Sequence, residues 1–450
     1  MIRRMASNPV PPAAPLPRFP DGFLFGVSTS AHQIEGAVDE RDPSVWDAFT
    51  AEPGRVKDGS TAETACDHYH RYREDVALLR DLGVDAYRFS VSWPRVKSPG
   101  GLDFYDRLVD EVCAAGVRPV PTLFHWDLPL ELDWLNRDTA ARFAEYAAVV
   151  AGRLGDRVGT WITLNEPAEH TLLGHALGVH APGRRLLFDA LPVAHHQLLA
   201  HGLAVRALRA AGATDIGIAN SHGPVRAASE DPEDVAAADF YDVLLNRLFA
   251  DPLLLGRYPE GIAELLPGDV GADLEVIAEP LDWYGVNYYQ PTRVGAPQGT
   301  EIEFGGLTLP AELPFSVRDI PGPPKTDFGW PVVPEALTEL LTGFRDRYGD
   351  RLPPVIITEN GCSYGGLDDQ DRITFLDAHI RALHRAWQSG VTVRGYFVWS
   401  LLDNFEWAEG YTQRFGLVHV DFDTLERTPK ASYRWLREKL DGKQISPSGV

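Results

Sequence analysis

Residues 160–167 read T-W-I-T-L-N-E-P, a short apolar run that ends in an amide and a carboxylate. The amphipathic stretch Ala141–Leu154 precedes this run, and Gly155 lies between the two, where a helix would end. An alternation of helix and strand favours a parallel sheet that is covered by helices.

The same unit recurs along the chain. Short β-branched or aromatic runs predict strands at Phe23–Ser28, Ala86–Trp93, Pro119–Trp126, Thr160–Glu166, Asp215–Asn220, Trp283–Tyr289, Val355–Glu359 and Gly395–Leu401. Amphipathic stretches predict further helices at Asp67–Leu82, Ala190–Ala210, Pro334–Tyr348 and Asp371–Gln388. These units predict an α/β fold, a closed (β/α)8 TIM barrel with its active face at the carboxyl ends of the strands. An open doubly wound sheet is the alternative, although no G-x-G-x-x-G motif follows the first run.

The spacing indicates a single domain with long βα loops. Residues 1–18 are rich in proline and indicate a flexible N-terminal leader, so the catalytic barrel would span residues 19–450. The longest gaps between runs are residues 220–283 and 289–355. The second gap holds several glycines and prolines, and we expect a long lid or rim loop there.

Composition and charge exclude several classes of partner. Hydrophobic residues form 44% of the 450 residues and charged residues 24%, a balance typical of a folded globular protein. Asp and Glu total 64 against 42 Lys and Arg, which gives a formal net charge of -22. This charge repels phosphate backbones and anionic lipids, so we expect no nucleic-acid and no membrane partner. The sequence carries no signal for the oligomeric state.

The cysteines and the N-terminus favour a cytoplasmic location. Cys66, Cys113 and Cys362 are odd in number and far apart, which argues against a disulfide framework or a zinc ribbon. Arg3 and Arg4 could begin a twin-arginine signal, but no apolar segment follows them.

Two predicted strands end in a glutamate beside an asparagine. Glu166 follows Asn165 after the fourth run, and Glu359 precedes Asn360 after the seventh. Either glutamate alone could face solvent or cap a helix, but a carboxylate beside an apolar strand is costly unless it is paired. Two of them at one barrel face suit chemistry at an acetal carbon. One acid would protonate the leaving oxygen, while the other attacks or activates water.

A pair of carboxylates would equally suit a divalent cation. A metal site would need further ligands nearby, as histidine or aspartate. The candidate pairs His68/His70 and His195/His196 lie in helical stretches, away from the strand ends. We therefore expect neither a metal nor a cofactor.

The other strand ends carry side chains that suit sugar recognition. Amide, imidazole and carboxylate groups bind hydroxyls, and flat aromatic rings cover the apolar faces of sugars. Trp399 or Phe415 alone would indicate core, but together these side chains would surround one opening. The candidates are Gln33, Arg88, His125, Trp126, Asn287, Tyr289, Trp399, Glu406, Trp407 and Phe415.

From Phe19 to about Leu440 the sequence resembles glycoside hydrolase family 1, the retaining β-glucosidases. Single motifs of four or five letters would be weak evidence, but here eight stand in the family's order. They are F-P-D-G-F-L-F-G from Phe19, H-Q-I-E-G from His32, R-F-S-V-S-W-P-R from Arg88, T-L-F-H-W-D-L-P from Thr122, T-L-N-E-P from Thr163, V-N-Y-Y from Val286, I-T-E-N-G from Ile357 and G-Y-F-V-W-S-L-L-D-N-F-E-W from Gly395.

The resemblance implies a role for each candidate. Glu166 would be the general acid/base and Glu359 the nucleophile, with Asn165 on the sugar 2-hydroxyl. Arg88 and Tyr289 would flank the nucleophile. The substrate would also meet Gln33, His125, Trp126, Asn287, Trp399, Glu406, Trp407 and Phe415.

Positions that distinguish branches of the family predict an unmodified sugar. The 6-phosphoglycoside branch typically has serine, lysine and tyrosine where this chain has Glu406, Gln413 and Phe415. Thioglucosidases replace the acid, here Glu166, with glutamine.

Two departures lie toward the leaving-group side and leave the acceptor preference open. The family usually has tryptophan at the position of Ala168, and a longer stretch with two glycines at Leu130–Asp133. We predict a retaining exo-β-glycosidase, most simply a β-glucosidase, acting on small β-glycosides or short oligosaccharides. A transglycosylase with an alcohol acceptor, a 6-phospho-β-glycosidase, a non-catalytic sugar-binding protein and a metal-dependent barrel hydrolase stay open as competing functions.

Overall fold

The computed structural model describes residues 14–304 and 307–441. Within them, parallel strands close into one barrel in the order β1-β13-β12-β7-β5-β4-β3-β2. These strands are β1 (Leu24–Ser28), β2 (Ala86–Ser90), β3 (Arg118–Phe124), β4 (Trp161–Asn165), β5 (Ile216–Ser221), β7 (Tyr284–Asn287), β12 (Val355–Asn360) and β13 (Val393–Trp399). Each overlaps a predicted run, so the predicted (β/α)8 barrel is confirmed and the open sheet is wrong.

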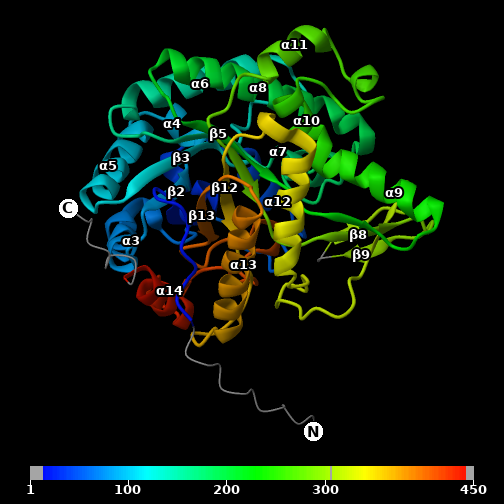
Figure 1. The fold of residues 1–450 in the computed structure, drawn as a ribbon. Coiled ribbons are helices and arrows are strands. Elements are labelled where there is room, and N and C mark those ends of the chain that lie inside the picture. The colour runs from blue at the N-terminus through cyan, green and yellow to red at the C-terminus, as the bar shows by residue number, and fades with distance from the viewer. Residues whose placement is uncertain (1–13, 305–306, 442–450) are drawn as a thin grey trace.

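Helices surround the barrel (Figure 1). The predicted helices are observed as α3 (His68–Leu82), α6 (Asp138–Leu154), α8 (Leu191–Ala210), α12 (Pro334–Tyr348) and α13 (Gln370–Gln388). Further helices are α1 (Ala31–Ile34), α2 (Val45–Thr50), α4 (Trp93–Lys97), α5 (Gly101–Ala114), α7 (Pro167–Glu169), α9 (Pro232–Asp242), α10 (Leu248–Leu255), α11 (Val270–Ile277) and α14 (Ala431–Asp441). Short 3₁₀ and π segments are η1 (Val38–Glu40), η2 (His170–Ala176), η3 (Leu187–Ala190), η4 (Val243–Arg247), η5 (Ala263–Leu265), η6 (Gly349–Arg351) and η7 (Trp407–Glu409).

The inside of the barrel is filled by large side chains that face glycines. Trp283 packs so closely on Gly217 that a Cβ there would lie 2.5 Å from the indole. Phe397 faces Gly26 in the same way, at 2.3 Å from such a Cβ. Both aromatic rings are buried in one cluster with apolar residues of other strands. This packed layer closes the barrel beneath the carboxyl ends of the strands.

The segment between β7 and α12, predicted as a long lid or rim loop, lines the cavity with Leu309, Phe315 and Trp330 and also contains short strands. β8 (Thr292–Gly295) lies between β6 (Val225–Ala227) and β11 (Ser316–Arg318) in a small sheet. β9 (Ile302–Phe304) pairs with β10 (Leu307–Leu309). α9 packs against β6 and β8 (Figure 1). The sequence did not predict these strands because they are only three or four residues long, too short for a periodic signal.

The chain ends lie beside the last helices. Arg381 of α13 donates to the carbonyl oxygens of Ala14 and Pro15, at 3.4 and 3.2 Å. Phe19 stacks on Phe23 with ring centroids 4.0 Å apart. β14 (Val418–Val420) and β15 (Arg427–Pro429) form a two-stranded sheet before α14. Most of the predicted leader, residues 1–13, lies outside the described residues, so the boundary at residue 18 stays a prediction.

The cysteines and the hydropathy of the helices add two findings. Cys66 and Cys362 are buried and Cys113 is exposed, and all three are free thiols. Among the described residues, no helix combines the length and apolar character that a bilayer crossing requires. The cytoplasmic location stays a prediction.

Candidate active site

Both glutamates lie at the carboxyl ends of barrel strands. Glu359 belongs to β12, and Glu166 directly follows β4, before α7. Asn287, the last residue of the intervening strand β7, pairs in register with Glu359. The backbone of Glu166 has φ 45°, in the left-handed region, which costs a residue with a side chain about 1–3 kcal/mol. The surrounding fold therefore holds this side chain in a strained backbone conformation.

Glu359 accepts hydrogen bonds from two donors, the buried Arg88 and the half-buried Tyr289. Arg88 Nη1 donates to Oε1 at 2.5 Å, and the Tyr289 hydroxyl donates to Oε2 at 2.7 Å. Arg88 and Glu359 form a buried ion pair, with side chains 1% and 3% exposed. Burial, and then the charge of Glu359, hold the pKa of Tyr289 well above its usual range, so the phenol keeps its proton. Both contacts are of the kind that stabilise a carboxylate anion.

Glu166 lies beside an amide rather than a cation. Asn287 Nδ2 donates to Glu166 Oε1 and to Asn165 Oδ1, each at 2.9 Å. The Thr358 hydroxyl donates to Asn287 Oδ1 at 2.6 Å, which fixes the orientation of the amide. Burial raises the pKa of Glu166 well above its usual range, and the negative charge of Glu359 raises it further. Glu166 thus keeps its proton at a pH where an exposed glutamate has lost it.

The two carboxyls therefore have different environments within one site. Glu359 is paired with a guanidinium, whereas Glu166 is desolvated and has no ion pair in the described part of the chain. Such a division suits an anion that attacks and a neutral acid that gives up a proton.

Asn165 connects the glutamates to an imidazole. Its Oδ1 accepts from Arg88 Nη2 at 2.6 Å, and its Nδ2 lies 3.0 Å from His125 Nε2. Since an amide nitrogen only donates, His125 Nε2 must accept, so the ring is neutral with its proton on Nδ1. Burial, and then the charge of Arg88, lower the pKa of His125 well below its usual value. Both observations give an uncharged imidazole.

The glutamates open into a cavity of 880 Å³. Nine predicted site residues line this cavity: His125, Trp126, Glu166, Tyr289, Glu359, Trp399, Glu406, Trp407 and Phe415. Four more lie buried behind them: Gln33, Arg88, Asn165 and Asn287. The structure thus brings all of the predicted residues together, and the buried four support those that line the cavity.

Stacked rings form one wall. Trp407 stacks on His125 with ring centroids 5.8 Å apart, and it packs at a tilt against Trp126 with ring centroids 4.7 Å apart. Trp399 stacks on the same imidazole at 5.7 Å. Trp126 Nε1 donates to the backbone carbonyl of Asn165 at 3.0 Å, which ties this wall to β4.

Glu406 is a third carboxyl in the cavity wall, and it is half-buried. Gln33 Nε2 donates to its Oε2 at 3.4 Å. Burial, followed by the charges of Glu359 and Glu409, raises the pKa of Glu406 to about 8. Glu406 is therefore mostly protonated at neutral pH, and it can donate as well as accept a hydrogen bond.

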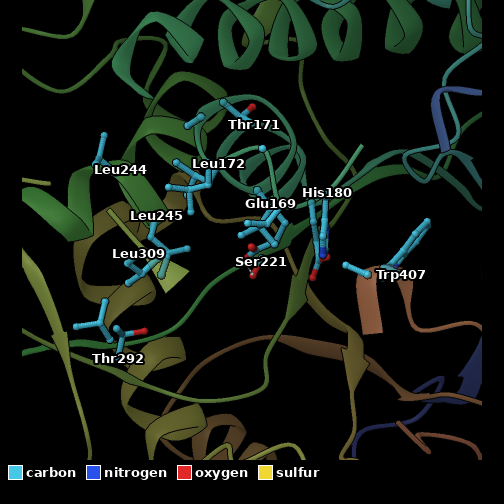
Figure 2. Close-up of a pocket in the computed structure, with 18 of the residues that line it drawn as sticks. Glu169, Thr171, Leu172, His180, Ser221, Leu244, Leu245, Thr292, Leu309 and Trp407 are labelled. Atoms are coloured by element: carbon cyan, nitrogen blue, oxygen red, sulfur yellow. Dashed lines mark hydrogen bonds between the residues drawn. The ribbon is translucent and has the colours of Figure 1, made fainter. Parts of the chain in front are cut away.

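Glu169, a further carboxyl in the cavity wall, was not predicted from the sequence. It ends α7, three residues after Glu166, and Ser221 Oγ donates to its Oε1 at 2.9 Å. Figure 2 shows Glu169 above Ser221, close to Leu172. A charged side chain one helical turn beyond a strand-end glutamate was the signal that could have found it.

Phe328 and Trp330 were also missed. Both line the cavity, and Trp330 packs on Tyr289 and Phe415 with centroids 5.4 and 5.9 Å apart. They lie in the segment that was predicted as a loop, where periodicity gives no information.

The histidine pairs lie away from this site. His68 is buried against Asp75 at 2.8 Å, and His195 bonds to Tyr258 at 2.8 Å. His196 bonds to the Trp134 carbonyl oxygen at 2.8 Å. No group of three or more metal-ligating side chains that could hold an ion occurs in the described part of the chain.

The sequence profile of glycosyl hydrolase family 1 matches residues 16–444. The chain belongs to glycosyl hydrolase family 1. The predicted family is therefore confirmed, and the eight motifs lie where this hydrolase places its barrel strands and site.

Similar proteins agree with this membership. Beta-glucosidase A of Thermotoga maritima is 43% identical over 444 residues, covering 93% of this hydrolase and 96% of the relative. A beta-glucosidase of an Agrobacterium species is 44% identical over 458 residues, covering 96% of this hydrolase and 97% of the relative. The solved structure of the family 1 β-glucosidase from Thermotoga maritima superposes with a TM-score of 0.88 at 40% identity, covering 96% of this hydrolase and all of that chain. The crystal structure of the psychrophilic beta-glucosidase BglU from Micrococcus antarcticus superposes with a TM-score of 0.89 at 43% identity, covering 95% of this hydrolase and 98% of that chain.

Two positions depart from the family pattern, Ala168 and the short stretch Leu130–Asp133, and they have different surroundings. Ala168 is only 1% exposed and belongs to the main hydrophobic core. In the shortened stretch, Asp133 accepts a hydrogen bond from Arg184 at 2.5 Å.

Proposed function

We propose that this family 1 hydrolase is a retaining exo-β-glycosidase, a β-glucosidase that removes terminal non-reducing β-D-glucosyl residues from small β-glycosides or short oligosaccharides. One observation carries the proposal. Glu359 is held by Arg88 and Tyr289, whereas Glu166 is desolvated and has a raised pKa. The names of the relatives, beta-glucosidases, support glucose as the sugar.

In the first step Glu359 attacks the anomeric carbon while Glu166 protonates the leaving oxygen. The bond from C1 to the aglycone oxygen breaks, a bond from C1 to a Glu359 oxygen forms, and the aglycone leaves as a neutral alcohol. Arg88 and Tyr289 keep the attacking carboxylate in place through their hydrogen bonds. Asn165 holds the sugar 2-hydroxyl, because Arg88 and Asn287 fix the orientation of its amide.

In the second step Glu359 carries no charge, because it is part of the glycosyl-enzyme. The anion that raises the pKa of Glu166 is then gone, so Glu166, which has lost its proton, can accept one from water. The water oxygen bonds to C1, the bond from C1 to Glu359 breaks, and the sugar leaves with its original configuration.

The remaining lining residues bind the sugar ring. Glu406, supported by Gln33, and the imidazole of His125 meet hydroxyl groups. Flat rings cover the apolar face of the sugar. The proposed sugar-binding residues are Gln33, His125, Trp126, Asn287, Trp399, Glu406, Trp407 and Phe415.

The cavity favours an unmodified sugar over a 6-phosphoglycoside. Glu406, which is mostly protonated at neutral pH, offers a phosphate no positive charge, and its ionised form about 4 Å from a phosphate would cost on the order of 4 kcal/mol per unit charge at an effective dielectric constant near 20. Gln413, which bonds to Ser363 at 2.9 Å, and Phe415 add no cation that could offset this repulsion.

The proposal is tested by trapping the covalent intermediate. A 2-deoxy-2-fluoro β-glucoside with a good leaving group should inactivate the enzyme, and peptide mapping should find the label on Glu359. A label on any other residue would overturn the assignment. Release of the label on addition of an alcohol, with a β-glycoside as the product, would measure transglycosylation.

A binding protein and a metal-dependent hydrolase would each behave differently in activity assays. A non-catalytic sugar-binding protein would show no turnover of an aryl β-glucoside. A metal-dependent hydrolase would lose its activity in a chelator, whereas the proposed mechanism is insensitive to one.

A further inference from the structure

Glu169 lies in the cavity wall but has no part in the mechanism proposed above. Ser221 Oγ donates to its Oε1 at 2.9 Å, while its Oε2 has no hydrogen-bond partner among the described residues. No Lys, Arg or His of the described chain forms an ion pair with it. Burial raises the pKa of Glu169. Glu169 is half-buried, so a ligand that expels water from this part of the cavity gains free energy if it also brings a hydrogen-bond donor to the unused oxygen.

The position of Glu169 places it on the leaving-group side. Most of the proposed sugar-binding residues lie at the ends of β1, β3 and β13 or after them, and Asn287 ends β7, whereas Glu169 follows β4 and Ser221 ends the adjacent strand β5. In Figure 2, Trp407 and His180 lie to one side of Glu169, and Leu244 and Leu309 lie to the other. A sugar placed against Trp407 therefore directs its aglycone past Glu166 toward Glu169.

The part of the cavity beyond Glu169 is apolar. Its walls include Leu172, Leu244, Leu245, Leu309 and Phe315. A cavity of 880 Å³ is near the upper end for a drug-sized ligand, so it holds more than one sugar ring. Thr171, Tyr241 and Thr292 also line the cavity. The leucines alone would favour a hydrophobic aglycone, and Glu169 adds a carboxyl beside them.

We propose that Glu169 is a specificity-determining residue of the leaving-group subsite, which selects aglycones with an apolar body and a hydroxyl group that donates to Glu169 Oε2. This inference rests on the proposed β-glucosidase function. The apolar body fills the leucine-lined lobe, and the hydroxyl supplies the donor that the described chain does not. Without Glu169 the preference should reverse, since a hydroxyl in an apolar lobe is then left without a partner.

Matched aryl glucosides test this inference. Phenyl β-glucosides that carry either an ethyl or a 2-hydroxyethyl group, at the ortho, meta or para position, differ in one hydroxyl and hardly in leaving-group acidity. The wild type should prefer the hydroxyethyl compound by about tenfold in kcat/KM at one ring position or more. Because both substrates of a pair use the same acid/base, any effect of Glu169 on Glu166 cancels in the ratio.

Three variants isolate the contribution of Glu169. Glu169→Leu should bring the ratio to one or below, while Glu169→Gln, whose amide oxygen still accepts, should retain a preference for the hydroxyethyl compound. Leu245→Ala enlarges the same lobe, so it should lower kcat/KM for both substrates and leave the ratio within about twofold.

The outcomes separate the two proposals. A wild-type preference for ethyl at every ring position, or a ratio that Glu169→Leu leaves unchanged, would overturn the role of Glu169 while β-glucosidase activity stands. Failure of the wild type to hydrolyse any of these glucosides would overturn the proposed function, and this inference with it.

Discussion

Arg88 donates one hydrogen bond to Glu359 and another to Asn165, at 2.5 and 2.6 Å. These two partners come from β12 and β4, which are not neighbours in the barrel. A single guanidinium therefore fixes the distance between the proposed nucleophile and the proposed ligand of the sugar 2-hydroxyl. A planar cation with several donors is needed for this arrangement.

Replacing Arg88 with lysine should disrupt this arrangement while keeping the charge. An ammonium cannot span both partners, so we expect kcat/KM for an aryl β-glucoside to fall roughly 100-fold. Arg394→Lys is the matched control, because Arg394 makes a two-nitrogen ion pair with Asp215 at the opposite end of the barrel. Equal losses in the two variants would contradict the role of Arg88.

Glu166→Gln should affect substrates according to their leaving group. A glutamine cannot donate a proton, so kcat/KM for alkyl or phenyl glucosides should fall about 10²–10⁴-fold, while 2,4-dinitrophenyl glucoside should lose much less in its first step. The wild-type kcat/KM should decrease as pH rises through the raised pKa of Glu166, and this decrease should be absent in the variant. Steady-state kinetics across pH measure the dependence of kcat/KM on the leaving group and on pH. An equal loss of kcat/KM for every leaving group would count against Glu166 as the acid.

Because the pKa of Glu406 is raised, we expect its contribution to the unfolding free energy to fall as pH rises. Burial raises its pKa to about 8, so between its unfolded pKa near 4.5 and 8 the folded state binds the proton that the unfolded state has lost. The contribution of this carboxyl to stability is therefore fully present below pH 4.5 and declines as pH rises toward 8. Glu406→Gln should raise the unfolding free energy at pH 7.5 by about 1–3 kcal/mol and have little effect at pH 4.5. Denaturant melts at both pH values check this, and an equal gain at both would refute it.

Because the pKa of Asp75 is lowered, we expect its contribution to the unfolding free energy to fall as pH decreases. Burial alone would raise its pKa, but hydrogen bonds from His68 and Arg427 outweigh burial and lower it. Its contribution is therefore present above the unfolded pKa and is lost as pH falls through the folded one. Asp75→Asn leaves Arg427 buried without its partner and should cost about 3–5 kcal/mol at pH 7, with a smaller loss in acid. Thermal melts across pH measure this, with the exposed pair Arg437–Asp81 as the control through Asp81→Asn.

The barrel could be predicted from the sequence because its strands are long enough to carry a signal. β4 was predicted from T-W-I-T-L-N-E, and α12 was predicted with its observed bounds because Pro334 begins it and Gly349 follows it. The small sheet of β6, β8 and β11 was not predicted, because strands this short depend on packing against α9 rather than on their own pattern.

The site was predictable only where a motif marked it. Glu166 and Glu359 stand at strand ends beside asparagines, which a reader of the sequence can find. Glu169 stands one helical turn after Glu166 in the sequence, but its contact with Ser221, on another strand, is visible only in the folded chain. Likewise, the partners of Asn287 come from β4 and β12, and no local pattern shows that these strands meet around it.

The segment between β7 and α12 has a consequence for how this enzyme can be altered. Leu309 of β10, Val317 of β11 and, between these strands, Leu313 and Phe315 line the cavity, whereas the reacting carboxyls stand at the ends of barrel strands. A mutant library confined to these four positions can therefore reshape the range of accepted alcohols and phenols without touching the bond-breaking machinery. In evolutionary terms, this part of the chain is free to diverge while the chemistry stays constant.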